Sequence, residues 1–143
     1  MLNIKGEAVS FHLFYEGKEG SGEASQMPAP VTEGTPVFRD IQIKDVWCAG
    51  AEAALLVNGL PELPLDRLVV ENLRYSGKHG TRCRNASNLV LRDAHICVKS
   101  GPLITLDNCE SALVERLNGE SGTNGTFVHV LGTRPNGIVC PDV

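Results

Sequence analysis

Residues 36–106 repeat one short pattern three times, and this repeat decides the fold. The copies read PVFRDIQIKDVWCAG, PLDRLVVENLRYSG and ASNLVLRDAHICVKSG, and a fainter fourth copy reads CESALVERLNG. Each of the first three copies has two apolar residues two positions apart and a short polar residue two positions later. These residues are Ile41, Ile43 and Asp45, then Leu68, Val70 and Asn72, then Leu89, Leu91 and Asp93.

Apolar residues at positions i and i+2 have the spacing of a β-strand, so each copy predicts a short strand and not a helix. The segments between the copies contain further strand-like runs, which read AALLVN, PLITL and TFVHVLG. A repeat of about 20 to 30 residues is typical of stacked supersecondary units. The sequence therefore predicts an all-β chain folded as a parallel β-helix of about five to six coils, with neighbouring coils about 4.8 Å apart.

The alternation also predicts which side chains enter the core. One residue of each apolar pair is expected in an inward column, and the residue before it is expected on the opposite face. The inward set is Ile43, Val70 and Leu91, and the outward set is Gln42, Val69 and Val90. The short polar residues of the three copies are expected at one corner, where they bond the backbone and each other.

The composition restricts the class of protein. With 143 residues the chain is one domain by length, and its 42% hydrophobic but 5% aromatic content predicts an aliphatic core. The net charge of −4 offers no basic stripe, so no nucleic-acid partner is expected. The sequence has no run of about 18 apolar residues, and strand-like sequence follows Met1 at once. We therefore expect neither a membrane span nor a signal peptide.

The cysteines indicate structural thiols and not a metal site. There are five, and no CxxC pair or Cys/His cluster has the spacing of a zinc site. We expect no metal and no cofactor, and we expect the thiols to act as small buried hydrophobes. A disulfide between coils stays open as an alternative. The five residues are Cys48, Cys83, Cys97, Cys109 and Cys140.

The N-terminal part contains a strand-like segment and a long loop. Residues 2–15 alternate in part and are expected to form a full coil with no cap before it, which predicts a fragment of a longer β-helix. An uncapped coil exposes a strand edge, so a homo-oligomer through this coil is predicted. Residues 16–35 are rich in Gly, Ser, Pro and Glu. They form either a functional loop or a solvated excursion.

Four phrases of the sequence resemble one enzyme family. They are TEGTPVFRDIQIKDV, GLPELPLDRLVVENL, GTRCRNASNLVLRDA and GPLITLDNCESA. In this order and spacing they resemble the C-terminal coils of family 28 glycoside hydrolases, the polygalacturonase-type enzymes, over residues 2–139. The resemblance implies a right-handed β-helix of the pectin-lyase type, in a parent enzyme that hydrolyses pectin-type polysaccharide with inversion. Such a parent enzyme would be periplasmic or secreted.

The catalytic motifs of that family are absent from this sequence. The family uses Asn-Thr-Asp, Asp-Asp, Gly-His-Gly and Arg-x-Lys segments, and the nearest match is KHG, whose His79 is interpreted as a turn residue. An inverting glycosidase needs two carboxyl groups about 6.5 to 9.5 Å apart. The candidates Asp45, Asp93 and Asp107 fit corner positions instead. We therefore assign no catalytic residue and expect the chain alone to be inactive.

Four residues are candidates for contact with a sugar. Tyr15 is expected to edge a subsite by stacking, and Glu33, Arg39 and Glu62 lie on or beside loops. The predicted function is the C-terminal β-helix part of a polygalacturonase-like hydrolase, which extends the helix and shapes one wall of the substrate groove. The alternatives are a non-catalytic carbohydrate-binding or self-assembling module, and an unrelated β-helix such as a lyase or a phage adhesin. No carboxylate-rich cluster of the kind that a lyase calcium site needs is seen.

Overall fold

The computed structural model describes residues 4–12, 30–122, 126–132 and 136–141, and every element in these ranges is a β-strand. All pairings between the strands are parallel. The expected all-β parallel solenoid is therefore confirmed. The strands are β1 (Glu7–His12), β2 (Arg39–Asn58), β3 (Leu65–Arg84), β4 (Ala86–Val98), β5 (Ile104–Asp107), β6 (Glu110–Glu120) and β7 (Val128–Leu131).

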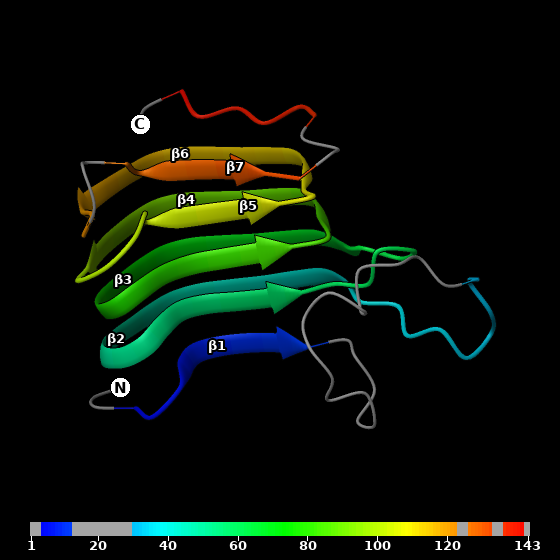
Figure 1. The fold of residues 1–143 in the computed structure, drawn as a ribbon, viewed down its shortest axis with the longest axis horizontal. Helices are drawn as coiled ribbons and strands as arrows, with labels where there is room; N and C mark the ends of the chain where they lie inside the picture. Colours follow the sequence, from blue (N-terminus) through cyan, green and yellow to red (C-terminus); the bar gives the residue numbers. More distant parts are fainter. Residues whose placement is uncertain (1–3, 13–29, 123–125, 133–135, 142–143) are drawn as a thin grey trace.

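About four turns stack along the axis of the solenoid (Figure 1). β2 and β3 have 20 residues each, and each forms one turn because the strand bends in its middle. The next turn combines β4 with β5, and the last combines β6 with β7. The first halves of the turns stack in the order β2, β3, β4 and β6, whereas the second halves stack in the order β1, β2, β3, β5 and β7.

The expected number of about five to six coils was too high. β1 pairs only with the second half of β2, so the described part of residues 2–15 contributes one strand and not a full coil. After β7 the described chain adds two isolated bridges, Glu110↔Asn136 and Leu113↔Val139, and no further strand. With six residues, β1 is too short to form a complete turn like those of β2 and β3. The right-handed sense implied by the resemblance stays a prediction.

The bends in the long strands depend on close backbone contacts. β2 bends at an irregularity between Ala49 and Ala51, where Gly50 has a φ of 79°. In β3 the bend lies at Gly77, where an added Cβ would collide with the carbonyl oxygen of Ala51 and with the Tyr75 hydroxyl. That hydroxyl donates a hydrogen bond of 2.8 Å to the same carbonyl oxygen, and burial raises the pKa of Tyr75 to about 12. The corner therefore admits only glycine at position 77.

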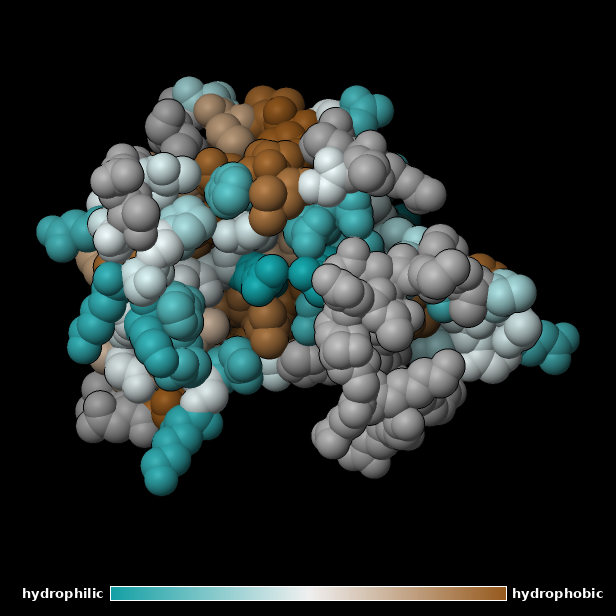
Figure 2. Space-filling model, in the orientation of Figure 1, coloured by the Kyte–Doolittle hydropathy of each residue, from teal (hydrophilic) through white to brown (hydrophobic). Residues whose placement is uncertain are grey.

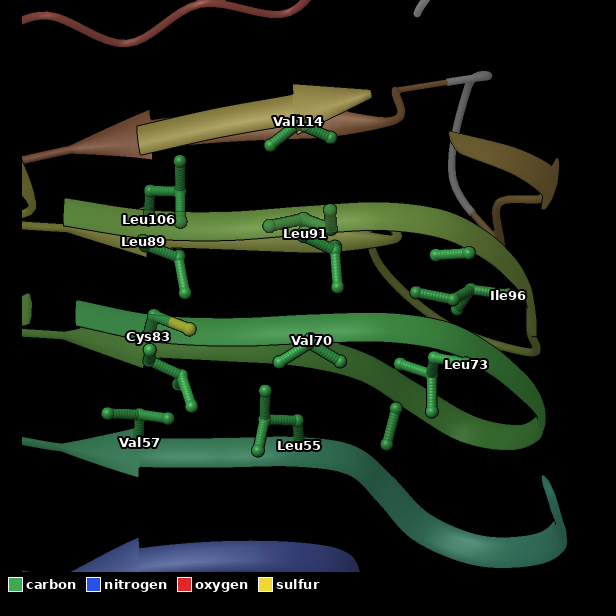
Figure 3. Close-up of a cluster of buried hydrophobic side chains, with 14 of the residues drawn as sticks. Leu55, Val57, Val70, Leu73, Cys83, Leu89, Leu91, Ile96, Leu106 and Val114 are labelled. Atoms are coloured by element: carbon green, nitrogen blue, oxygen red, sulfur yellow. The ribbon is translucent and has the colours of Figure 1, made fainter. Parts of the chain in front are cut away.

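The core consists of aliphatic columns that run through successive turns (Figure 3). In one column Val70, Leu91 and Val114 are register partners, and each is at most 2% exposed. Burying a side chain of this size stabilises the fold by about 1.5–3 kcal/mol. The predicted inward column is confirmed at Val70 and Leu91, whereas Ile43 is only half-buried in the first of these turns. The residues expected on the opposite face are more exposed than that core: Gln42, Val69 and Val90.

Two corners of each turn hold residues in the left-handed region of backbone space. Most L-residues avoid this region, and Asn and Asp tolerate it best. One column has φ between 49° and 56° and contains Asp45, Asn72, Asp93 and Arg116. A second column, five residues earlier in each turn, has φ between 51° and 57° and contains Asp40, Arg67, Asn88 and Ser111. The predicted corner ladder is confirmed by Asn72, whose Nδ2 donates to Asp45 Oδ1 at 2.7 Å.

Arginine at two of these corners is held by a carboxylate of the preceding turn. Arg67 Nη2 donates to Asp40 Oδ2 at 2.9 Å, and Arg116 Nη2 donates to Asp93 Oδ2 at the same distance. These hydrogen bonds, together with the guanidinium charges, hold the pKa of Asp40 and of Asp93 below the usual value. The ion pairs are exposed and therefore modest in energy, but they join neighbouring turns at a strained backbone position.

The cysteines confirm the expected role in three of five positions. Cys48, Cys83 and Cys109 are buried, and all five thiols are free, so the structure contains no disulfide between coils. Burial raises the pKa of Cys83 and of Cys109, which makes both thiols unreactive. Cys97 and Cys140 are only half-buried; Cys140 packs against the core, whereas Cys97 is not part of it.

Candidate functional site

The outward side of the first halves of β2, β3, β4 and β6 carries a row of four large polar or aromatic side chains. The register places each of them beside the next on the neighbouring strand. Adjacent strands lie about 4.8 Å apart, so the row spans about 14 Å along the solenoid axis. All four residues are exposed. This outer row consists of Trp47, Arg74, His95 and Asn118.

The outer row is positioned by the corner column described above. In every turn the outer-row residue follows the left-handed corner residue by two positions, as Trp47 follows Asp45 and His95 follows Asp93. The side chain between them enters the core, for example Val46 or Ala94, so the next one must point outward. Trp47 is 76% exposed, an unusual position for a large aromatic side chain.

A second outward row lies two residues further along the same strands. It includes Cys97, whose Sγ lies 3.4 Å from Nε2 of His95. The other ring nitrogen, Nδ1, is hydrogen-bonded to Oδ1 of Asn118 on β6. His95 and Cys97 share a face because they are two residues apart on β4, and Asn118 is the register partner of His95. A thiol, an imidazole and an amide are thereby brought into one connected group.

A third outward row joins the turns by charge. Lys44, Glu71, Arg92 and Glu115 are register partners on the same four strands. Lys44 Nζ lies 2.9 Å from Glu71 Oε2, and Arg92 Nη1 lies 3.6 Å from Glu71 Oε1. Exposed pairs of this kind are worth about 0–1 kcal/mol each. The third row is therefore a structural ladder, and we do not treat it as a binding site.

The second halves of the turns present a different surface. Figure 2 shows this side, over β5, β7 and the ends of β2 and β3, as hydrophobic bands interrupted by hydrophilic side chains. Its central outward row mixes polar, apolar and basic side chains, and it contains no Trp, Tyr or Phe. The row consists of Ser10, Leu56, Arg82, Thr105 and His129.

The sugar-contact candidates from the sequence are not brought together. Glu33 lies in the centre of an exposed turn between Thr32 and Thr35, and Glu62 lies half-buried in the bend between β2 and β3. Arg39 begins β2, and its exposed Nε lies 4.0 Å from Asp40 Oδ2. In the part of the chain that the structure describes, no hydrogen bond or ion pair joins Glu33, Arg39 or Glu62 to one another. Tyr15 lies outside the described residues.

The segments around Glu33 and Glu62 do lie on the same side of the solenoid. Figure 1 shows residues 30–38 and 59–64 projecting on the side where the second-half strands end. The outer row lies instead on the outward side of the first-half strands, just after the left-handed corner of each turn. The sequence candidates and the outer row are therefore separate regions.

The carboxylates at the predicted corners are occupied by structural contacts. Asp45 and Asp93 bond Asn72 and an arginine of the next turn, as described above. Asp107 ends β5 and accepts a hydrogen bond of 2.9 Å from Nε of Arg84 in a partly buried pair. These contacts fit the corner interpretation and not an acid and base on one groove.

The interpretation of His79 as a turn residue was wrong. It lies within β3, next to Ala53 of β2, and its side chain is exposed. The strand continues past the bend at Gly77, because the backbone keeps its ladder contacts with β2 through the corner. Gly77 and Gly80, which lie on either side of His79, allow close backbone contact with the neighbouring coils.

The sequence contains a signal for the outer row that periodicity alone does not reveal. Each residue of the outer row stands six positions after the first member of the apolar pair in its repeat, as Trp47 does after Ile41 and His95 does after Leu89. Once the repeats are aligned by their apolar pairs, the four residues fall in one column. Whether that column faces solvent depends on the local inversion of side-chain direction at the corner.

The described residues contain neither a metal-binding cluster nor a membrane-spanning helix. No group of three or more His, Cys, Asp or Glu side chains in residues 4–12, 30–122, 126–132 and 136–141 is arranged to hold a metal ion. Within the same ranges no helix is long and apolar enough to cross a membrane. Comparisons with protein-family models, with curated proteins and with solved structures returned no match.

Proposed function

We propose that this chain is the non-catalytic β-helix part of a polygalacturonase-like glycoside hydrolase, and that it holds pectin-type polysaccharide along the outer row. The single observation that carries the binding proposal is the alignment of Trp47 with Arg74, His95 and Asn118 across four adjacent parallel strands. The resemblance of the repeated phrases to the C-terminal coils of those enzymes supports the polysaccharide class. The row would extend the wall of a substrate groove along the solenoid axis.

The chemistry of the outer row suits an acidic sugar chain. An exposed indole offers a flat apolar surface against which a sugar ring packs, and Trp47 provides it. A uronic acid residue carries a carboxylate, and the guanidinium of Arg74 is able to bind a carboxylate through two parallel hydrogen bonds. The amide nitrogen of Asn118 adds donors for hydroxyl groups. A row about 14 Å long is long enough for several sugar residues.

Binding is tested by titrating oligogalacturonate into the protein in a calorimeter at low ionic strength, with a neutral β-glucan oligosaccharide as the comparison ligand. We expect Trp47→Ala and Arg74→Ala each to weaken oligogalacturonate binding by about tenfold, the usual loss for a central aromatic or arginine contact. Arg82→Ala is the matched control, because Arg82 is an exposed arginine on the second-half side. Equal loss in Arg82→Ala, or no binding of oligogalacturonate by the wild type, contradicts the proposal.

Hydrolysis is tested in the same samples. We expect no release of reducing sugar from polygalacturonate or rhamnogalacturonan by the isolated chain, since Asp45, Asp93 and Asp107 are used in contacts between turns. Release above a heat-inactivated control that persists through repurification contradicts this expectation.

A second candidate is self-assembly through the first half of β2, and one observation favours it. Within the described residues this half-strand pairs with β3 on one edge and with no strand on the other. Apolar side chains lie half-buried along it, and Val37 and Phe38 just before it are exposed. A second copy of the chain is the occupant that we propose, because an open strand edge offers backbone groups in the spacing of another strand.

Self-assembly is measured by light scattering coupled to size-exclusion chromatography over a dilution series. We expect a concentration-dependent dimer or larger species, and Ile43→Lys is expected to shift it toward monomer by placing a charge at the open edge. Gln42→Lys, which adds the same charge on the exposed side of the same strand, is the control. A monomer at all concentrations, with native circular dichroism, contradicts this candidate.

A further inference from the structure

Cys97, His95 and Asn118 have the relative placement of an activated nucleophile. The thiol lies next to one nitrogen of the imidazole, at 3.4 Å between Sγ and Nε2, and the amide oxygen of Asn118 contacts the other nitrogen. A nucleophile within reach of a base that is itself oriented by a third group is the general signature of covalent chemistry. The three side chains come from two adjacent strands of a rigid sheet, so their geometry does not depend on a loop.

The hydrogen bond to Asn118 determines where the imidazole proton lies. An amide oxygen only accepts, so Nδ1 of His95 must donate to Oδ1 of Asn118. The neutral ring then has its lone pair on Nε2, which faces Sγ of Cys97. His95 is thereby oriented to accept the thiol proton and not to donate one. Asn118 acts as a positioning residue for the base.

We propose that Cys97 is a nucleophilic thiol that undergoes exchange with low-molecular-weight disulfides, with His95 as its base. The Cys97 proton moves to Nε2 of His95, and the sulfur attacks one sulfur atom of the disulfide R–S–S–R. The S–S bond of the reagent breaks, a mixed disulfide between Cys97 and R–S forms, and the departing thiolate takes the proton from His95. Cys97 is oxidised and one R–S group is reduced, so atoms and electrons balance.

Acyl transfer fits this site less well than disulfide exchange. An acyl enzyme develops an oxyanion that needs preorganised donors, usually backbone N–H groups. Near Cys97 such groups are already used between turns: Lys99 N donates to Gly77 O and Gly122 N donates to Gly101 O, each at 3.1 Å. Disulfide exchange needs no such donors, because the negative charge leaves on the departing sulfur.

The other cysteines provide internal comparisons. Cys48, Cys83 and Cys109 are buried in the core and inaccessible to a disulfide reagent. Cys140 is half-buried like Cys97, but burial raises its pKa, and no histidine contact to it is found in the described residues. Cys97 is therefore expected to react first. This inference does not rest on polysaccharide binding.

The experiment measures the rate of reaction with 5,5′-dithiobis(2-nitrobenzoate) and with glutathione disulfide in the folded protein. Peptide mapping by mass spectrometry assigns each adduct. At pH 7 we expect Cys97 to react about tenfold faster than Cys140, because an unassisted cysteine is only a few per cent thiolate there. His95→Ala is expected to slow Cys97 by about tenfold at pH 7 but not at pH 10, where hydroxide ionises thiols without a base.

Two further variants separate chemistry from folding. Asn118→Ala is expected to slow Cys97 by less than His95→Ala, since it leaves the base but removes its orientation. His79→Ala is the matched control, because His79 is also an exposed histidine but its register partner is Ala53 and not a cysteine. In this variant Cys97 is expected to react at the wild-type rate. The proposal is overturned if Cys97 reacts no faster than Cys140 at pH 7. It is also overturned if His95→Ala changes the rate by the same factor at both pH values while circular dichroism stays native.

Discussion

The first halves of β2 and β3 carry the same apolar pattern but are buried to different degrees. In β3 the inward residues Leu68 and Val70 are at most 1% exposed, whereas their register partners in β2, Ile41 and Ile43, are only half-buried. β3 lies between β2 and β4, while the described residues place a neighbour on only one edge of this part of β2. The comparison shows that the apolar pattern specifies which side chains point inward. How deeply they are buried depends on whether a further turn of the solenoid packs beside them.

The largest effect is expected from a charge placed in the interior column. Val70→Asp buries a carboxylate among aliphatic side chains with no partner, which costs several kcal/mol of unfolding free energy. Val69→Asp should cost about 1 kcal/mol, since its side chain lies on the outward side and keeps contact with water. Urea unfolding followed by circular dichroism measures both. Equal losses would show that this strand is buried on both faces.

Truncation of matched residues tests the difference between the two half-strands directly. Leu68→Ala should lower the unfolding free energy by about 2–5 kcal/mol, because it leaves a cavity between two turns. Ile41→Ala should lower it by about 1 kcal/mol, since the half-buried side chain has less contact to lose. Thermal and urea unfolding of the two variants give the comparison. A loss at Ile41 as large as that at Leu68 would mean that the edge is covered in solution.

A polar atom inside the second-half column gives a smaller effect of opposite sign. Thr81 is 3% exposed, lies between Leu55 and Ile104, and its hydroxyl has no hydrogen-bond partner among the described residues. Thr81→Val should therefore raise the unfolding free energy by about 1 kcal/mol. Thr105→Val, on the outward side, is the control and should not stabilise the protein. Destabilisation by Thr81→Val would indicate that the hydroxyl is satisfied in solution.

The smallest effect concerns the corner ion pairs at the two ends of the first-half stack, one between β2 and β3 and one between β4 and β6. The partners Arg67 and Arg116 lower the pKa of Asp40 and Asp93 below 3.8, so each pair stabilises the fold above that pH. The contribution is lost as the pH falls through the lowered pKa. Unfolding free energies between about pH 5 and about pH 2 should therefore fall less steeply in Asp40→Asn and Asp93→Asn than in the wild type. If the unfolding free energies of the variants and of the wild type fall equally steeply with pH, the ion pairs do not persist in solution.

The candidate site was less predictable than the core, and the reason is local. Alternation gave the correct inward direction at Val70 and Leu91, because no left-handed residue separates either of them from the other member of its apolar pair. The left-handed residue at Asp93 interrupts that alternation, so the direction of His95 cannot be obtained by counting from Leu91. Loop composition also directed attention to Glu33 and Glu62, although the connected group of thiol, imidazole and amide lies on the adjacent strands β4 and β6.

The sequence by itself determined the parallel solenoid, the aliphatic columns and the polar corners. These follow from the two-residue period of a strand and from a repeat that places equivalent residues of successive turns beside each other. The tertiary structure decided which turns are fully buried and which residues meet across strands. Cys97 and His95 are neighbours on one strand, but Asn118 reaches them only through the register of β4 with β6. That register spans 23 residues of chain. It is set by the packing of the columns beneath, because a shift of one residue would turn apolar side chains out of the core.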